Sequence, residues 1–412
     1  MDYRDTYQYR LLEKLCFPRF GGTEGELRAA QLLQEEITAL GGNSELMPFD
    51  IPAYEIDRCT FSANGKPISC VAMGHSGQLP EGGMEMPLKY VESNTEAAFL
   101  SLGNLTGCAA LINTFDLDMY QELVNRNVAA IIEIDNGKWY ENKELISVEM
   151  RPRYLAVGQV PVFTIGVRDA MELVNTGTEM VTLELRQHSF TNISHNVLAT
   201  VEGTDISDEC IVLTAHYDST SVSPGAYDNG SGAVTLMYIY RHFLRNRPRR
   251  TMHFIWCGSE EQGLLGSQAY VAAHEDTLSN VRLCYNLDSC GTILGENNID
   301  IAGNDALKEL TEQLCKEWGF VTEVFVFPDG SDSAPFANKG IPAVCPGRGH
   351  WTSCEDHTRR DTIETISPQR LHEMGEFSVF YLERFVNADV FPVEREMPEE
   401  LAQKLDAMCH PN

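Results

Sequence analysis

From His195 onward, short apolar runs alternate with longer stretches of helical character. Runs of strand length fall at 196–201, 210–215, 252–257, 281–287, 322–327 and 341–345. Stretches with helical spacing of their apolar residues fall at 230–246, 262–275, 305–318 and 368–387. Strands and helices that alternate in this way build layered folds around a mainly parallel sheet. This part of the chain therefore predicts an α/β fold, a three-layer sandwich with a mostly parallel or mixed central sheet.

A second region differs in its pattern of apolar runs and turn residues. Between about 50 and 190 the sequence consists of short β-rich runs broken by Gly, Asn and Pro, which predicts a separately folded, β-rich domain. Before it, Thr23 and Glu26 have capping-box spacing and predict a helix over 23–42 that ends at two glycines. We therefore expect one domain made of 1–49 and 191–395, an inserted domain at 50–190 and a C-terminal tail at 396–412.

Charge and hydropathy argue against several classes of partner. The 412 residues include 31 basic and 60 acidic ones, a net charge of −29, and such a surface repels phosphate backbones and anionic lipids. No stretch approaches the ~20 apolar residues of a membrane span, and the first residues contain no apolar signal segment. The twelve cysteines are scattered singly. We expect a cytoplasmic protein that binds neither nucleic acid nor membranes, and nothing in the sequence indicates an oligomeric state.

Five polar clusters carry the chemistry of the first domain, and most of them follow an apolar strand. They contain His216 with Asp218, Asp228, Glu260 with Glu261, Asp288, and His357. Taken singly, most of them have a simpler interpretation as a helix cap, a turn or a surface loop. The adjacent glutamates are harder to explain in this way, because like charges at the end of a buried strand need a cation.

Together, the clusters offer two imidazoles and several carboxylates at one edge of the predicted sheet, where ligands gather beyond the carboxyl ends of strands. This mixed set of nitrogen and oxygen ligands suits zinc, whereas an all-oxygen set would indicate magnesium or calcium. A bridging aspartate is able to hold two ions ~3.5–4 Å apart. The sequence therefore predicts a site for two zinc ions.

Longer motifs surround these residues. They are His216-Tyr217-Asp218-Ser219, Asp228-Asn229-Gly230-Ser231-Gly232, Glu260-Glu261-x-Gly263-Leu264-x-Gly266-Ser267, Ser331-Asp332-x-Ala334-Pro335-Phe336, Gly340-Ile341-Pro342-Ala343 and His357-Thr358-x-x-Asp361-Thr362. Through them the sequence resembles the co-catalytic zinc peptidases of the aminopeptidase Y and glutamate carboxypeptidase family. Residues 50–190 resemble the protease-associated domain that many members carry, through Gly107-x-Ala109-x-Leu111-Ile112, Asn127–Ile132 and Val160-Pro161-Val162.

The resemblance implies which residue holds which ion. Asp228 would bridge two zinc ions. His216 and Asp288 would complete one site, and Glu261 and His357 would complete the other.

The same resemblance implies that Glu260 is the general base and that Asp218 orients His216. The implied activity is that of an aminopeptidase, in which water activated by two zinc ions hydrolyses the first peptide bond. The charge of the site agrees with this activity, because a cluster of carboxylates attracts a protonated α-amine. We therefore expect the substrate to be a peptide with a free N-terminus.

Three other functions fit parts of the same pattern. A glutaminyl cyclase-like acyltransferase has the same kind of fold and a similar metal site, and a non-catalytic binding protein could use the same scaffold. A carboxypeptidase or dipeptidase would need a cation for the substrate carboxylate, for which the candidates are Arg348, Arg359 and Arg360. The candidates for a second donor to the oxyanion are Tyr217, His350 and Trp351, and His350 is also the alternative to His357 as a ligand.

Overall fold

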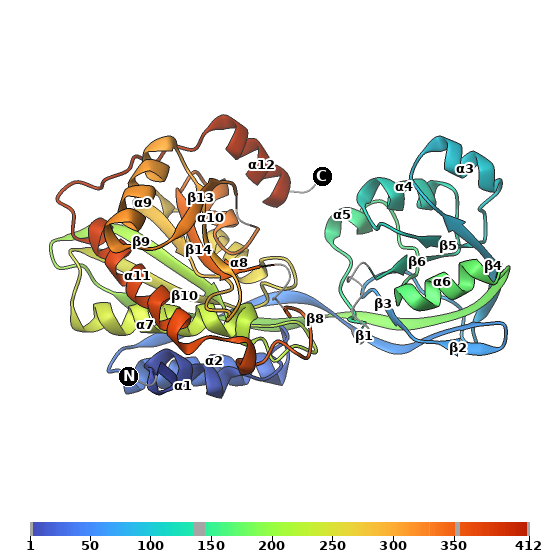
Figure 1. The fold of residues 1–412 in the computed structure, drawn as a ribbon, viewed down its shortest axis with the longest axis horizontal. Coiled ribbons are helices and arrows are strands. Elements are labelled where there is room, and N and C mark those ends of the chain that lie inside the picture. The colour runs from blue at the N-terminus through green and yellow to red at the C-terminus, as the bar shows by residue number, and fades with distance from the viewer. Residues whose placement is uncertain (1–2, 136–144, 329, 351–354, 410–412) are drawn as a thin grey trace. The chain divides into compact units, whose positions relative to one another are not determined.

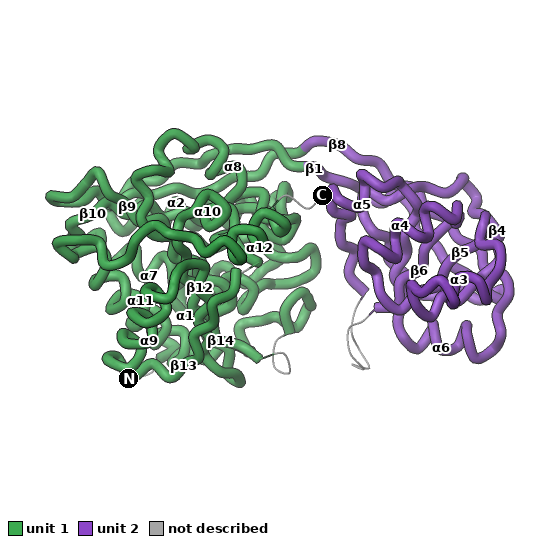
Figure 2. The backbone as a smooth tube through the Cα atoms, turned by 90° about the horizontal axis from the view of Figure 1, so that it is seen from above, with its two compact units in different colours: residues 1–51, 192–412 green, residues 52–191 purple. Residues whose placement is uncertain are grey.

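Two units make up the chain (Figure 1). Each unit has its own hydrophobic cores. The computed structural model describes residues 3–135, 145–328, 330–350 and 355–409. Unit 1 comprises residues 1–51 and 192–412, and unit 2 comprises residues 52–191 (Figure 2). The limits expected for the inserted domain were 50 and 190, so the limits of unit 2 lie within two residues of them.

The sheet of unit 1 is mixed and mostly parallel, as the sequence predicts. Its strands are β9 (Ile206–His216), β10 (Arg250–Cys257), β11 (Val281–Asn286), β12 (Glu296–Ala302), β13 (Thr322–Val326), β14 (Ala343–Gly349) and the end of β8 (Met180–Val201). They lie in the order β13-β12-β14-β11-β9-β10-β8. Strand β9 is parallel to β10 and β11, β11 to β14, and β12 to β13. The antiparallel neighbours are β12 with β14 and β8 with β10.

Helices cover both faces of this sheet, which gives the three predicted layers. In β9, Ile211 and Leu213 enter the core on one face, and Cys210 and Val212 enter the core on the other, so the strand needs an unbroken apolar run. The first core is closed by α1 (Tyr7–Leu15), α2 (Glu24–Ala39), α7 (Ser231–Arg245), α9 (Asp305–Trp318) and α11 (Pro368–Val386). The second core is closed by α8 (Leu265–Ala273), α10 (Ala334–Asn338) and α12 (Glu399–Cys409).

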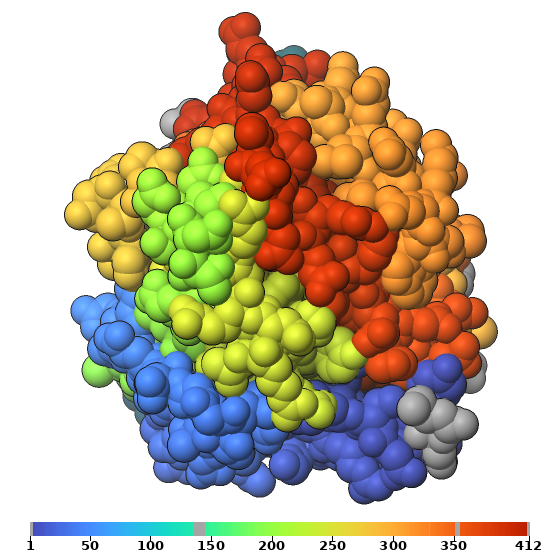
Figure 3. All heavy atoms as spheres, turned by 90° about the vertical axis from the view of Figure 1, so that its left-hand side faces the viewer, coloured from blue at the N-terminus to red at the C-terminus, as the bar shows by residue number. Residues whose placement is uncertain are grey.

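Helices near both ends of the chain pack into unit 1. Helices α1, α7 and α11 contact one another, and Figure 3 shows blue, yellow-green and red segments of the chain gathered on one face. Helix α12 packs against α10 and buries Leu401 and Leu405 in the second core. The described part of 396–412, which was expected to be a C-terminal tail, therefore packs into unit 1 through α12.

Unit 2 is built around a smaller sheet. Its strands are the later part of β1 (Ser44–Ala63), β2 (Lys66–Ile68), β3 (Cys70–Ala72), β4 (Met84–Val91), β5 (Ala109–Ile112), β6 (Ala130–Ile134), β7 (Val162–Ile165) and the first part of β8. Strands β4, β5, β6 and β7 are parallel neighbours, whereas β3 pairs antiparallel with β7 and β8 with β4. The helices are α3 (Glu96–Leu102), α4 (Leu117–Asn125), α5 (Pro152–Leu155) and α6 (Val167–Asn175).

The described residues of unit 1 also form short helices. They are η1 (Tyr3–Asp5), η2 (Ala226–Gly230), η3 (Leu278–Asn280) and η4 (Ile363–Thr365). In the part of the chain that the structure describes, no helix is both long and apolar enough to cross a bilayer.

Candidate metal centre

Three neighbouring parallel strands deliver most of the predicted site residues to one edge of the sheet. Strand β9 ends at His216, Glu260 and Glu261 follow β10, and Asp288 follows β11. The register pairs Cys257, the last residue of β10, with His216. Because parallel strands end at the same edge, these segments meet there and their polar side chains converge.

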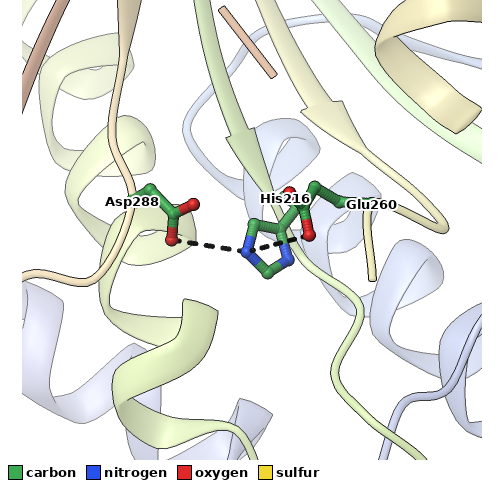
Figure 4. Close-up of side chains that lie close together, drawn as sticks. All are labelled: His216, Glu260 and Asp288. Atoms are coloured by element: carbon green, nitrogen blue, oxygen red, sulfur yellow. Dashed lines mark ion pairs between the residues drawn. The ribbon is translucent and has the colours of Figure 1, made fainter. Parts of the chain in front are cut away.

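The His216 imidazole lies among three carboxylates. Its Nε2 is 3.4 Å from Asp288 Oδ1 and 3.9 Å from Glu260 Oε2 (Figure 4). The same nitrogen is 3.2 Å from Asp228 Oδ1. The histidine is only 1% exposed, so this nitrogen is shielded from bulk water.

The second imidazole comes from the loop before η4. His357 Nε2 is 3.1 Å from Asp228 Oδ2 and 3.1 Å from Glu261 Oε2. The two oxygens of Asp228 therefore face different histidines, with Oδ1 towards His216 and Oδ2 towards His357. His350, the alternative ligand, lines a cavity together with Asp288.

Asp218 connects the two glutamates to His216. One of its carboxylate oxygens accepts the backbone N–H of Glu260 at 3.1 Å, and the other accepts that of Glu261 at 3.2 Å. Oδ1 also lies 3.4 Å from His216 Nδ1, the nitrogen that points away from the cluster. Asp218 is completely buried, so it holds the imidazole and the loop after β10 in a fixed relation.

Residues to which the sequence assigned no role hold Asp228. The Asp228–Asn229 peptide bond is cis. The Asp361 carboxylate accepts the backbone N–H groups of Tyr227 at 2.7 Å and Asp228 at 3.0 Å. The Asn229 side chain donates to the carbonyl of Leu287 at 2.9 Å, which joins η2 to the segment after β11.

Arg19 is a second missed residue. Its side chain is completely buried and donates to the backbone carbonyls of Leu15, Phe17, Tyr217, Pro224 and Gly225. It therefore connects the turn between α1 and α2 with two segments: Tyr217, directly after β9, and Pro224–Gly225, directly before η2. No local pattern signals such a role, because the partner Tyr217 is 198 residues away in the sequence.

Glu26 has a role beyond the predicted helix cap. Its backbone N–H does donate to Thr23 Oγ1 at 3.4 Å, as the capping-box spacing predicts. Its carboxylate, however, accepts from the hydroxyls of Ser194 at 2.5 Å and Ser259 at 3.3 Å. Burial raises the pKa of Glu26 to about 8. Because Ser259 immediately precedes Glu260, this carboxyl group supports the loop after β10.

The ligand atoms form two groups of the size that a metal ion occupies, and within each group they lie within 4.8 Å of one another. One group contains His216, Glu260 and Asp288, and the other contains Asp228, Glu261 and His357. The structure thus brings together the five predicted ligands and the predicted base. The predicted base Glu260 is itself a member of the first group, while Asp228 contacts the histidines of both.

The charge of this cluster fits a divalent cation. Among the described residues, no lysine or arginine forms an ion pair with the four carboxylates, whose partners are the two histidines. Two carboxylates 4 Å apart repel each other by about 4 kcal/mol at an effective dielectric constant of 20. Burial and the neighbouring carboxylates raise the pKa of Glu261 to about 7 and that of Glu260 well above its ordinary value. A cation with affinity for nitrogen and oxygen would remove this repulsion.

Two other predicted side chains are engaged elsewhere. The Tyr217 hydroxyl donates to the His195 carbonyl at 2.8 Å, so the structure does not support Tyr217 as a donor to an oxyanion. Arg348 donates from Nε to the carbonyl of Thr292 and from Nη1 to Asn297 Oδ1, both at 3.1 Å. The third candidate donor, Trp351, lies outside the described residues.

Comparison with known proteins identifies the family. Residues 196–382 match the model of Peptidase family M28. The chain is 30% identical over 383 residues to Aminopeptidase YwaD of Bacillus subtilis (strain 168), with 89% of this chain and 80% of that protein covered. Among solved structures, BSAP, a zinc aminopeptidase from Bacillus subtilis, has a TM-score of 0.78 at 25% identity, with 96% of this chain and 98% of that chain covered. A Peptidase M28 precursor from Shewanella amazonensis SB2B shares the fold with a TM-score of 0.79 at 21% identity over 96% of each chain. The chain belongs to peptidase family M28.

Proposed function

We propose that this chain is a metal-dependent aminopeptidase that uses two zinc ions to hydrolyse the first peptide bond of a peptide with a free N-terminus. The observation that carries the proposal is the position of Asp228, whose two oxygens lie 3.2 Å from His216 and 3.1 Å from His357. One shared carboxylate between two imidazoles is the arrangement that a pair of ions needs. Family membership and the likeness to a zinc aminopeptidase support it.

The proposed ligand set follows this division. His216 and Asp288 would hold one zinc ion, Glu261 and His357 would hold the other, and Asp228 would be shared between them. When bound, such ions polarise the scissile carbonyl and lower the pKa of a water molecule towards ~7. Two imidazole nitrogens in the donor set favour zinc over magnesium or calcium, which prefer oxygen ligands.

Glu260 is the proposed general base. Its Oε2 lies 3.9 Å from His216 Nε2, so the carboxylate is at the border of the cluster and within reach of a water molecule there. A carboxylate in this position suits a group that takes a proton from the attacking water and returns it to the leaving amine. The backbone hydrogen bond to Asp218 keeps the residue in this position.

The charges around the cluster favour the N-terminal end of a peptide. The carboxylates attract a protonated α-amine, whereas a C-terminal carboxylate needs a cation. Two of the arginines considered for that purpose have partners of their own: Arg348 is bonded to Thr292 and Asn297, and Arg360 pairs with Glu355 at 2.8 Å. These contacts favour the aminopeptidase over a carboxypeptidase or dipeptidase.

The proposal is tested with one short peptide in three forms: unmodified, N-acetylated and C-amidated. Acetylation should abolish hydrolysis, because it removes the charged amine, and amidation should change the rate little. The opposite pattern identifies a carboxypeptidase. Absence of hydrolysis in all three forms, with zinc added, identifies a non-catalytic protein on the same scaffold.

Elemental analysis separates the remaining alternative. Two zinc ions per chain are expected for the peptidase, and about one is expected for a glutaminyl cyclase-like acyltransferase. Saturation at one ion or fewer contradicts the two-metal proposal.

We also propose that unit 2 is a protease-associated-like domain that contributes no ligand. All residues of the two ligand groups lie in unit 1, which supports this division of labour.

A further inference from the structure

A cavity of about 360 Å³ lies beside the proposed metal centre. Its lining includes Asp288, Ser289, Asn298, Asp300, Cys345 and His350. Asp288 is therefore shared between the metal centre and the cavity. Because these side chains are polar, the cavity suits a polar occupant better than an aliphatic one.

Glycine at position 347 keeps the wall next to the metal centre open. A Cβ atom there would lie 3.2 Å from Asn298 Oδ1 and 3.3 Å from the backbone oxygen of Asp288. Such distances are tighter than ordinary van der Waals contact. A side chain at position 347 would therefore displace the Asn298 amide or the segment that carries Asp288.

Asp300 brings into this cavity a carboxylate that forms no ion pair with a lysine or arginine among the described residues. Asn298 and Asp300 are two residues apart on β12 and share a face, whereas Ile299 and Ile301 enter the first core. Among the described residues, the hydrogen-bond partner of the Asp300 carboxylate is Asn298 Nδ2 at 3.3 Å, and no lysine or arginine forms an ion pair with it. Burial raises the pKa of Asp300, as expected for a carboxylate that water solvates poorly.

The arginine of the lining does not compensate this charge. Arg348 donates to the carbonyl of Thr292 and to Asn297 Oδ1. Asn297 points to the opposite side of β12 from Asn298 and Asp300, because side chains alternate along a strand. The Asp300 carboxylate is therefore available to a cation that enters from outside.

We propose that this cavity receives the side chain of the substrate's N-terminal residue, and that Asp300 and Asn298 select a cationic side chain, that of lysine or arginine. The inference rests on the proposed aminopeptidase function. With the α-amine and the first peptide bond at the metal centre, the next group of the substrate is this side chain, and Asp288 lies at the border between the two spaces. A hydrogen bond between an ammonium group and a carboxylate is about twice as strong as one between neutral groups, so it discriminates strongly by charge.

The test compares two peptides that differ only in their first residue, lysine or norleucine, with zinc-loaded enzyme. Norleucine has the same four-carbon chain without the ammonium group, so size is matched. The wild-type kcat/KM should be about tenfold or more higher for lysine. Asp300→Asn should lower this ratio by about tenfold while the zinc content stays at the wild-type value, because the amide keeps the shape but loses the charge. Glu309→Gln, which removes one exposed carboxylate from α9, is the matched control and should leave the ratio unchanged.

The outcomes separate this inference from the function on which it rests. Hydrolysis of both peptides without a preference for lysine overturns the inference and leaves the aminopeptidase proposal intact, and this result needs no variant. A preference for lysine at the second position instead of the first also overturns it. An unchanged ratio in Asp300→Asn assigns the preference to the general negative charge and removes Asp300 from the proposal. Hydrolysis of neither peptide overturns the aminopeptidase proposal, and the inference falls with it.

Discussion

The two imidazoles of the metal centre are held in different ways. His216 ends a central strand, is 1% exposed and has Asp218 behind its second nitrogen. His357 lies in a loop, adopts a left-handed φ of 58°, and has a side chain that is 52% exposed. The sheet therefore positions the first histidine, whereas the second depends on its contacts with Asp228 and Glu261. We expect the two proposed metal sites to differ in the same way, with the site of His216 the more persistent.

The largest effect should follow from removing the residue that both sites share. Asp228→Ala should lower zinc content from two ions to less than one and reduce kcat/KM by about 10⁴-fold or more, because metal ions contribute several kcal/mol and each 1.36 kcal/mol is a factor of ten. Elemental analysis and peptide hydrolysis measure the two effects. A variant that keeps both ions contradicts the bridging role.

Replacing the proposed base, Glu260, should lower the catalytic rate without lowering the zinc content. Glu260→Gln should reduce kcat by about 10²–10⁴-fold, because general-base catalysis is lost, while both ions are retained. The readouts are turnover and metal content of the same preparation, with Glu309→Gln as the control. Turnover close to that of the wild type would show that Glu260 is not the base, and loss of one ion would make it a ligand.

Replacing each histidine in turn tests the contrast directly. His357→Ala should retain about one zinc ion after dialysis, because the strand-borne site does not depend on the loop. Titration of the wild type with a chelator should remove zinc in two phases, and the variant should lack the first, more easily released phase. If His357→Ala lost both ions, or if His216→Ala retained more zinc than His357→Ala, the ranking of the two sites would be reversed.

A smaller effect is expected behind His216. Asp218→Asn removes the charge that faces Nδ1 and weakens the acceptors of the Glu260 and Glu261 backbone N–H groups. Loss of such a supporting carboxylate typically lowers metal affinity or activity about 10–100-fold. Competition with a chelator of known affinity measures this change. Unaltered affinity would mean that the strand alone positions His216.

The smallest effect on catalysis is expected at Glu26, where the readout is stability. Its pKa in the folded protein, about 8, exceeds its ordinary value of 4.5, so the folded state binds the proton more tightly. The resulting stabilisation is fully present below pH 4.5 and is lost as the pH rises towards 8. Denaturant unfolding at pH 5 and pH 8 should therefore show a smaller loss of stability in Glu26→Gln than in the wild type, by about 1 kcal/mol or more. Equal losses would contradict the raised pKa.

The strand-borne part of the centre was predictable because its residues follow continuous apolar runs. Such runs locate buried strands, and the ends of parallel strands converge, so His216, Glu261 and Asp288 are brought together by the topology alone. The loop residue His357 follows no such run, so it entered the predicted site only as one of a joint set of ligand types, and its assignment to one ion came from the resemblance to a family.

Other features depend on contacts that no local pattern contains. Strand β12 was missed because its Glu296–Asp300 portion is polar, and this composition follows from Asn298 and Asp300 lining a cavity instead of a core. Glu26 read as a helix cap because its buried partner Ser194 is 168 residues away. Arg348 was a candidate for binding a substrate carboxylate because its partner Asn297 is distant in the sequence. The pairing of β12 with β14 places Asn297 beside it.

Strands β1 and β8 carry the chain out of unit 1 and back into it, and they pair with each other. Unit 2 is therefore connected to unit 1 through two strands that are hydrogen-bonded to each other. A segment attached in this manner is exchangeable as a whole, because a replacement has to fit only this pair of strands while every proposed metal ligand stays in unit 1.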